Sequence, residues 1–128
     1  MTSERLRILV IDDCIDTAQS LTFLLRDDGH LAEYALNGRT AIDAAKLQRP
    51  ELIFLDIGLP DYDGVKLARD IKSTPGLEKI QIIALTGRIS DDEQRALEAG
   101  CDLFLSKPID PRTFVKVIKE VTERVAVR

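Results

Sequence analysis

The chain has 128 residues, of which 45% are hydrophobic and 31% are charged. This length fits one domain with a single apolar core, and the composition excludes extended disorder or low complexity. Eighteen basic and 22 acidic residues give a net charge of −4, and the scattered basic residues argue against direct nucleic-acid binding. We therefore expect one domain that spans residues 1–128.

The sequence also gives no support for a membrane protein, a secreted protein or a protein whose function depends on its cysteines. No apolar run approaches the roughly 18 residues of a membrane span, and Met1 to Arg7 lacks the apolar segment of a secretory signal. Cys14 and Cys101, the only cysteines, form neither a CxxC pair nor part of a Cys/His cluster. We expect a cytoplasmic protein with two ordinary reduced thiols.

Five short apolar runs rich in branched residues predict buried strands. In chain order the runs are Leu6 to Ile11, Ala32 to Leu36, Leu52 to Leu55, Ile80 to Leu85 and Leu103 to Leu105. The second run is the weakest and is closed by the turn pair Asn37-Gly38. His30, the only histidine, precedes this run in an expected surface turn, so we expect no catalytic role for it.

Segments with helical periodicity follow the first three runs, and each presents small or apolar residues on one face. These faces consist of Ala18, Leu21, Leu24 and Leu25 in the first segment, Ala41, Ala44 and Ala45 in the second, and Val65, Ala68 and Ile71 in the third. Each segment can cover a sheet with this face. The pattern predicts three amphipathic helices.

Two further helices follow the fourth and fifth runs. Ser90 and Glu93 form a capping box that opens the fourth helix, which Gly100 would close. Asp110 is the expected N-cap of the fifth helix, with Pro111 at its first position. The apolar face of that helix consists of Phe114, Val117, Ile118, Val121 and Val125. Because strand and helix alternate five times, we predict an α/β fold with right-handed crossovers and a parallel sheet covered on both faces.

Polar residues stand where these strands end. Ligands of open parallel sheets bind beyond the carboxyl ends of the strands, so we expect the side chains there to converge. They are Asp12 and Asp13 after the first strand, Asp56 after the third, Thr86 after the fourth and Lys107 after the fifth. Two carboxylates about 4 Å apart repel by roughly 4 kcal/mol at an effective dielectric near 20. This cost predicts a bound cation, and Mg²⁺ suits carboxylates that must also face a phosphoryl oxygen.

The same residue types fit phosphoryl transfer. A carboxylate can attack phosphorus and form an aspartyl phosphate. Positioning and neutralising the equatorial oxygens then provide most of the catalysis. We expect Lys107 to hold one oxygen, Thr86 to donate a hydrogen bond to another, and Mg²⁺ to contact a third.

Four sequence blocks together resemble the response regulator receiver domains of bacterial two-component signalling. The blocks are ILVIDD at Ile8 to Asp13, LIFLDIGLPDYDG at Leu52 to Gly64, ALTG at Ala84 to Gly87 and LSKPID at Leu105 to Asp110. Each block is weak by itself, but the four stand in the right order at the right spacing. The resemblance spans essentially the whole chain and is strongest to single-domain, chemotaxis-regulator-like receivers.

The resemblance implies a flavodoxin-like fold with strand order 2-1-3-4-5 and five helices. It implies that Asp56 is the phosphoacceptor, and that Asp12, Asp13 and the backbone carbonyl of Gly58 complete a Mg²⁺ site with it. Thr86 and Lys107 occupy the hydroxyl and lysine positions of the family, and Phe104 that of its switch aromatic. A cis Lys107-Pro108 bond is also implied. The resemblance is looser at Gly58 and Arg88, which flank the expected path of the hydrolytic water.

We therefore expect a phosphorylation-dependent switch that is not an enzyme beyond its own phosphorylation and dephosphorylation. A histidine kinase or histidine phosphotransfer protein would donate the phosphoryl group. An output partner would bind the face formed by the fourth helix, fifth strand and fifth helix, with no role for nucleic acid or membrane.

Three alternatives remain at this point. The chain could be a receiver excised from a hybrid histidine kinase. An aspartyl-nucleophile phosphohydrolase usually needs an acid/base Asp two residues after the nucleophile, where this chain has Cys14 or Gly58. A flavodoxin-like flavin module would need an anion cradle in the first loop, where Asp12 and Asp13 repel phosphate unless a metal is present.

Overall fold

Five segments form one parallel sheet in a computed structural model that describes residues 5–87 and 100–126, with side chains up to residue 123. The strands are β1 (Arg7–Ile11), β2 (Leu31–Ala35), β3 (Leu52–Asp56), β4 (Gln81–Thr86) and β5 (Leu103–Ser106). Their order is β2-β1-β3-β4-β5, which confirms the predicted topology. Each predicted boundary lies within one residue of the observed one. β3 is buried along its whole length, which explains its continuous apolar run.

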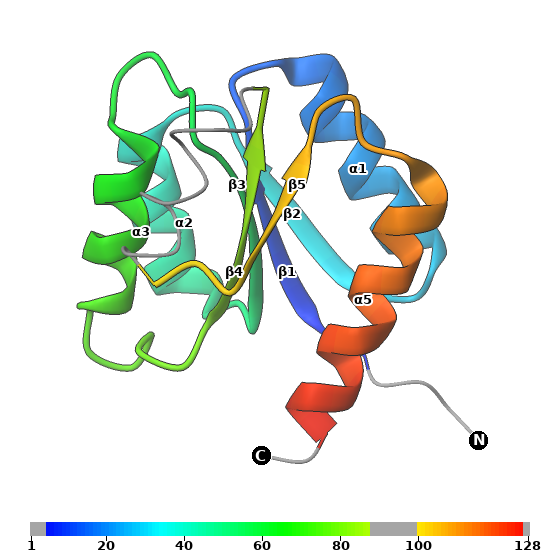
Figure 1. Cartoon of the computed structure of the whole chain (residues 1–128). Helices are drawn as coiled ribbons and strands as arrows, with labels where there is room; N and C mark the ends of the chain where they lie inside the picture. The colour runs from blue at the N-terminus through cyan, green and yellow to red at the C-terminus, as the bar shows by residue number, and fades with distance from the viewer. Residues whose placement is uncertain (1–4, 88–99, 127–128) are drawn as a thin grey trace.

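Helices cover both faces of this sheet (Figure 1). On one face lie α1 (Ile15–Asp27) and α5 (Pro111–Ala126), and on the other lie α2 (Gly38–Gln48) and α3 (Gly64–Lys72). The predicted fourth helix, which begins at Ser90, lies almost wholly outside the described residues. None of the described helices is long and apolar enough to cross a membrane.

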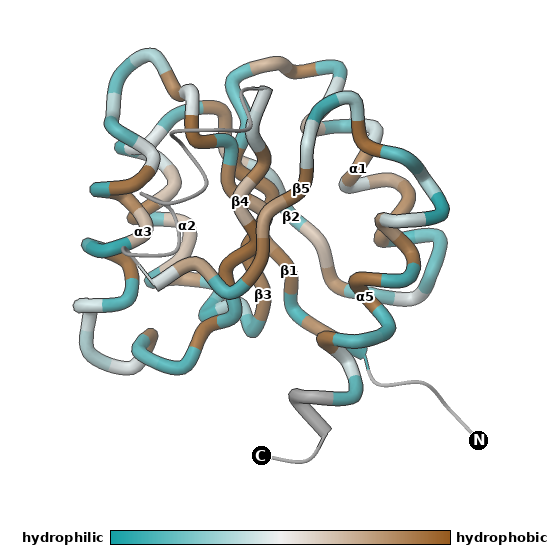
Figure 2. The backbone as a smooth tube through the Cα atoms, in the orientation of Figure 1, coloured by the Kyte–Doolittle hydropathy of each residue, from teal (hydrophilic) through white to brown (hydrophobic). Residues whose placement is uncertain are grey.

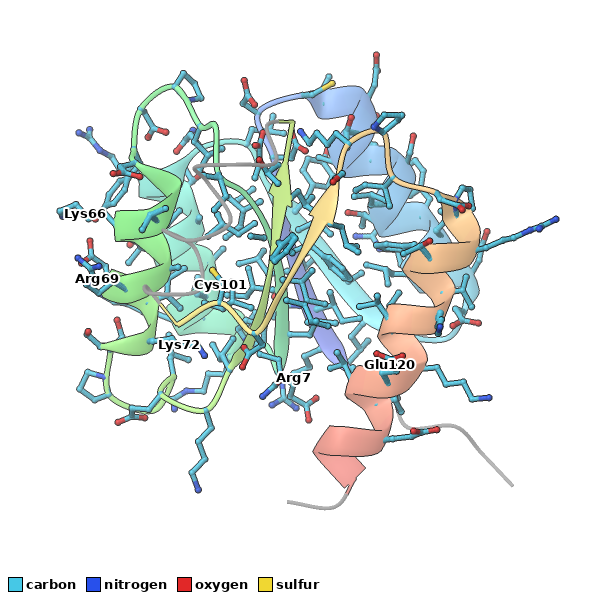
Figure 3. All side chains as sticks on the ribbon, viewed as in Figure 1. Arg7, Lys66, Arg69, Lys72, Cys101 and Glu120 are labelled. Atoms are coloured by element: carbon cyan, nitrogen blue, oxygen red, sulfur yellow. The ribbon has the colours of Figure 1, made fainter. Side chains whose placement is uncertain are left out.

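Two apolar cores separate the helices from the sheet, and the hydrophobic residues line the strands and the inner sides of the helices (Figure 2). In the core beneath α1 and α5, the rings of Phe54 and Phe114 lie 4.8 Å apart between centroids. Cys101 belongs to the other core, on the α3 side of the sheet (Figure 3). Among the described side chains the predicted inner faces are confirmed except at Leu24, which is exposed on α1 while its neighbour Leu25 is fully buried. The side chain of Val125, the last residue of the predicted face of α5, lies outside the described residues.

Side-chain caps fix the starts of α2 and α5. Asn37 caps α2, because its side chain accepts a hydrogen bond from the Thr40 amide at 2.9 Å. The predicted turn at Asn37-Gly38 is therefore the N-terminal start of α2, with Asn37 as the N-cap and Gly38 as the first helical residue. At α5, Asp110 accepts a hydrogen bond from the Arg112 amide at 3.0 Å, and Pro111 opens the helix as predicted.

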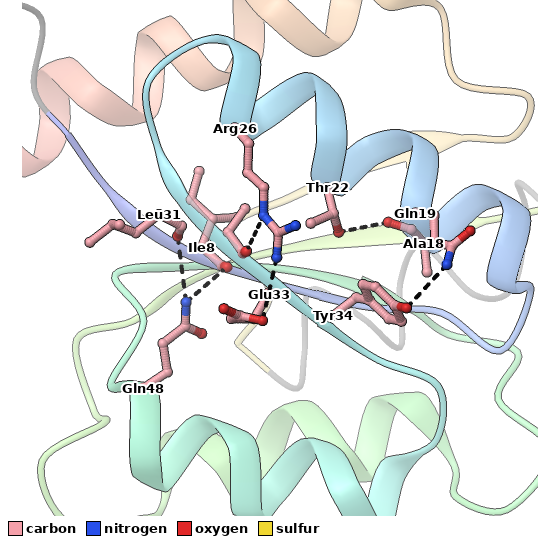
Figure 4. A network of polar contacts seen from close by, with 10 residues as sticks. Ile8, Ala18, Gln19, Thr22, Arg26, Leu31, Glu33, Tyr34 and Gln48 are labelled. Carbon is pink, nitrogen blue, oxygen red and sulfur yellow. Dashed lines mark hydrogen bonds and ion pairs between the residues drawn. The ribbon is translucent and has the colours of Figure 1, made fainter.

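Side chains from α1 and α2 also tie β2, the edge strand, to its neighbours (Figure 4). Arg26 of α1 donates to the carbonyl oxygen of Ala32 at 2.9 Å. Gln48 of α2 donates to the carbonyl oxygen of Ile8 in β1 at 3.1 Å. These contacts help to hold β2 against α1 and join α2 to β1.

The predicted surface position of His30 is wrong, because its side chain is buried. Its Nδ1 atom accepts a hydrogen bond from the Leu6 amide at 3.1 Å. Asp28-Gly29 indicated a turn correctly, since Gly29 has a φ of 92°. The residue just before β1 nevertheless contacts the ring through its amide, which the local sequence could not indicate.

Candidate functional site

The loops after β1, β3 and β5 meet at one edge of the sheet, the upper edge in Figure 1. Because the strands are parallel, their carboxyl ends all lie at this edge. Asp12 directly follows β1, Asp56 ends β3, Thr86 ends β4 and Lys107 directly follows β5. The fold therefore brings the predicted polar residues to one end of the molecule.

Three carboxylates form a tight cluster at this edge. Asp12, Asp13 and Asp56 each offer one oxygen, and these oxygens all lie within 4.8 Å of one another. Asp12 is fully buried and Asp56 is 7% exposed, whereas Asp13 is open to solvent. Such a cluster is electrostatically unfavourable without a cation.

Lys107 provides one positive charge to this cluster. Its Nζ atom lies 2.9 Å from Oδ2 of Asp12 and 3.2 Å from Oδ2 of Asp56. Burial disfavours the charged amine, but the hydrogen bond to Asp12 and the charge of Asp56 outweigh it and raise the pKa of Lys107. Lys107 is therefore a permanent cation at neutral pH, and it compensates only part of the charge of three carboxylates.

Backbone amides hold the other oxygen of the two buried carboxylates. The Cys14 amide donates to Oδ1 of Asp12 at 2.9 Å, and the Gly58 amide donates to Oδ1 of Asp56 at 2.9 Å. Asp12 and Asp56 are thus each fixed between an amide and the Lys107 ammonium group. The contribution of the Gly58 carbonyl to a metal site stays a prediction.

The remaining predicted residues lie on the last two strands. Thr86 is buried, and its carbonyl oxygen accepts a hydrogen bond from the Lys107 amide at 2.9 Å. Phe104 pairs with Ala84 and is half-buried against the core on the α2 and α3 side. The Lys107-Pro108 bond is cis, which confirms that prediction. Arg88 lies outside the described residues.

The donor set of the cluster is compatible with Mg²⁺. Mg²⁺ prefers hard oxygen ligands and commonly uses one or two carboxylates together with water. Asp12, Asp13 and Asp56 supply such oxygens, and the exposure of Asp13 leaves the cluster open to solvent. The residues therefore fit the cofactor that their chemistry predicts.

Comparison with known proteins identifies the family. The profile of the family described as "Response regulator receiver domain" matches residues 8–119. The chain belongs to the response regulator receiver family. Receiver domains are signalling modules of two-component systems, and the fold and the acidic edge described above fit that class.

Relatives of this receiver domain occur as short proteins and as parts of larger ones. The polar-differentiation response regulator DivK of Brucella anthropi is 31% identical over 113 residues, which cover 88% of this chain and 92% of DivK. A two-component response regulator of Clostridium difficile is 30% identical with a TM-score of 0.88, covering 94% of this chain and 98% of that one. The receiver domain of a histidine kinase from Syntrophus aciditrophicus is 34% identical with a TM-score of 0.85, and the match covers 94% of this chain and 92% of that one.

The hydrogen bonds of Asp61 in this receiver domain were not predicted from the sequence. The carboxylate of Asp61, in the loop between β3 and α3, accepts hydrogen bonds from the Gly38 amide at 2.9 Å and the Arg39 amide at 3.3 Å. The Gly38 bond is the main reason that the pKa of Asp61 lies below its usual range. The partners are 23 and 22 residues away, and no local pattern indicates such a contact.

Proposed function

We propose that this receiver domain accepts a phosphoryl group on Asp56 in a Mg²⁺-dependent reaction. The observation that carries the proposal is the set of groups around the Asp56 carboxylate. The Gly58 amide orients one oxygen, the Lys107 ammonium group lies 3.2 Å from the other, and the Asp12 and Asp13 carboxylates complete a metal-compatible cluster. A histidine kinase or histidine phosphotransfer protein would be the donor.

The choice of Asp56 over its neighbours follows from exposure and pairing. Asp12 is fully buried and pairs with Lys107 at 2.9 Å, so a donor cannot reach it. Asp13 is exposed, but the Lys107 contacts are to Asp12 and Asp56. Asp56 combines slight exposure, an oriented carboxylate and a nearby cation, as an in-line attack on phosphorus requires.

In the proposed step, an Asp56 carboxylate oxygen forms a bond to phosphorus while the bond from phosphorus to the donor nitrogen or oxygen breaks. The leaving group takes the electron pair and is protonated. Lys107 would hold one equatorial oxygen, and the Thr86 hydroxyl would donate a hydrogen bond to another. Asp12, Asp13, Asp56 and the Gly58 carbonyl would hold Mg²⁺, which when bound neutralises charge on the phosphoryl oxygens.

The output of the reaction would be a change in partner binding. Phosphorylation adds about −1.5 to −2 charges, which would draw the Thr86 hydroxyl and the Lys107 amine towards Asp56. Phe104, which is half-buried on β5, would then rotate inward behind Thr86. A partner that prefers the altered surface of β5 and α5 would shift the population towards it. The domain would act as a switch and catalyse only its own phosphorylation and dephosphorylation.

The direct test is intact-mass spectrometry after incubation with acetyl phosphate. We expect the wild-type chain to gain one phosphoryl group only when Mg²⁺ is present, and Asp56→Asn to gain none. Asp43→Asn, which removes an exposed carboxylate from α2, is the matched control and should label like the wild type. Labelling of Asp56→Asn at another residue would show that the assignment of the phosphoacceptor is wrong.

A further inference from the structure

We propose that Asp61 is a positioning residue that anchors the loop between β3 and α3 to the first turn of α2 and so fixes Gly58 beside Asp56. This inference rests on the proposed Mg²⁺-dependent function, in which the Gly58 carbonyl is a metal ligand. Asp61 would not touch the metal or the phosphoryl group. It would act through the loop that carries Gly58.

The anchor is a pair of hydrogen bonds at the start of α2. The first amides of a helix have no partner within the helix, and a negative charge near them is stabilised by the helix dipole. Asp61 accepts from the Gly38 and Arg39 amides, and Asn37 accepts from the Thr40 amide. Asp61 therefore completes the capping of α2 from a different part of the chain.

Tyr62, the residue after Asp61, lies close to the start of α2 and forms with it the junction between the loop and α2. A Cβ atom at Gly38 would lie 2.4 Å from Cβ of Tyr62, so glycine is what permits the loop and α2 to approach so closely. The Tyr62 hydroxyl donates a hydrogen bond to the carboxylate of Asp70 on α3. The loop is thus attached to α2 through Asp61 and to α3 through Tyr62.

The two ends of the same loop are fixed separately. At the start, the Gly58 amide is bound to Asp56 at 2.9 Å. At the end, Asp63 caps α3 by accepting from the Val65 amide at 3.0 Å, and a Cβ atom at Gly64 would lie 2.5 Å from Cα of Ile57. Without Asp61, the loop would keep these end contacts but lose its hydrogen bonds to α2. The peptide after Gly58 would then sample more orientations.

Mg²⁺ is sensitive to such a change, because it requires near-octahedral geometry. Outer residues that orient metal ligands typically contribute about 10- to 100-fold to metal affinity. Asp61→Ala leaves Asp56, Lys107 and Thr86 in place. We therefore expect the Mg²⁺ concentration for half-maximal phosphorylation to rise about tenfold, while the rate at saturating Mg²⁺ stays within about twofold of the wild type.

The experiment measures phosphorylation of the full chain by acetyl phosphate over a series of Mg²⁺ concentrations, with intact mass as the readout. A parallel NMR titration with Mg²⁺ follows the amide resonance of Gly58. Asp43→Asn is the matched control, because Asp43 lines the same groove as Asp61 and is also exposed, but it lies on α2 and not in the loop that carries Gly58. It should leave the Mg²⁺ dependence unchanged.

Two further variants separate anchoring from a general loss of structure. Asp61→Asn keeps one acceptor oxygen for the Gly38 amide, so it should restore part of the Mg²⁺ affinity lost in Asp61→Ala. Gly38→Ala displaces Tyr62 from the opposite side of the junction without altering the loop sequence, and it should also raise the half-saturating Mg²⁺ concentration.

The outcomes distinguish this inference from the proposed function. If the wild type is not phosphorylated with Mg²⁺, the proposed function is wrong and the role of Asp61 is lost with it. If the wild type is phosphorylated but Asp61→Ala keeps its half-saturating Mg²⁺ concentration, only the anchoring role is overturned. A lower maximal rate with unchanged Mg²⁺ dependence would also overturn it.

Discussion

The ammonium group of Lys107 lies 2.9 Å from Oδ2 of Asp12, so the end of β5 is joined to the end of β1 by an ion pair. The Asp12 side chain is fully buried, whereas the Lys107 side chain is 29% exposed. A buried carboxylate without a cation is costly. The ion pair therefore offsets part of the repulsion among the carboxylates at this edge of the sheet.

We predict that Lys107→Met lowers the free energy of unfolding in the absence of divalent ions. The expected loss is about 1 to 3 kcal/mol, because Asp12 loses its cation while the site remains partly open to water. Mg²⁺ should recover part of the loss, since it binds the native state. Urea unfolding with and without Mg²⁺ measures both effects. Lys119→Met, at an exposed position of α5, is the control, and an equal loss there would contradict the prediction.

A second prediction concerns coupling between Thr86 and Phe104. Thr86→Ala should still be phosphorylated on Asp56, because the carboxylate cluster and Lys107 are unchanged. It should show a smaller gain in partner affinity, because the buried hydroxyl that would follow the phosphoryl group is missing. Partner affinity is compared with and without beryllofluoride, which mimics the phosphoryl group. A full wild-type gain in Thr86→Ala would exclude this route of coupling.

A third prediction is a pH-dependent stability that originates at His30. Burial lowers the pKa of His30 below its ordinary value, although Asp28 opposes this, and Nδ1 must be unprotonated to accept from the Leu6 amide. The unfolded chain therefore binds a proton near pH 6.5 that the native chain does not bind. The free energy of unfolding should be highest above this pH and should fall below it, by at most about 1.4 kcal/mol per pH unit from this residue.

Urea unfolding of the wild type and of His30→Asn at pH 7.5 and pH 5.5 tests the role of His30. Asparagine offers an acceptor oxygen but does not titrate, so its stability should change less between the two pH values. Equal changes in the two proteins would assign the pH dependence to other groups.

The fourth prediction concerns the two thiols. Cys14 is exposed, and a hydrogen bond with the Thr17 side chain lowers its pKa, whereas burial raises the pKa of Cys101 to about 11. Iodoacetamide reacts with the thiolate, so the native protein should be alkylated at Cys14 and spared at Cys101. Peptide mass mapping measures this, and urea should make Cys101 reactive. Alkylation of native Cys14→Ser at Cys101 would contradict the burial of that thiol.

The sequence alone was sufficient to predict the features that depend on residues close together along the chain. Strand positions follow from continuous apolar runs, and the start of α5 follows from Asp110 and Pro111, because burial on both faces and helix capping leave local patterns. The acidic edge could also be predicted. Once the strands are known to be parallel, the residues that follow them must lie at the same edge.

Only the tertiary structure decided the contacts that join distant parts of the chain. Asp61 meets the Gly38 amide across 23 residues, and His30 meets the Leu6 amide across 24. Locally, Asp61 resembles any loop carboxylate and His30 any residue after a turn. Their roles depend on which backbone amides the packed helices and strands bring to them, and neither periodicity nor turn chemistry carries that information.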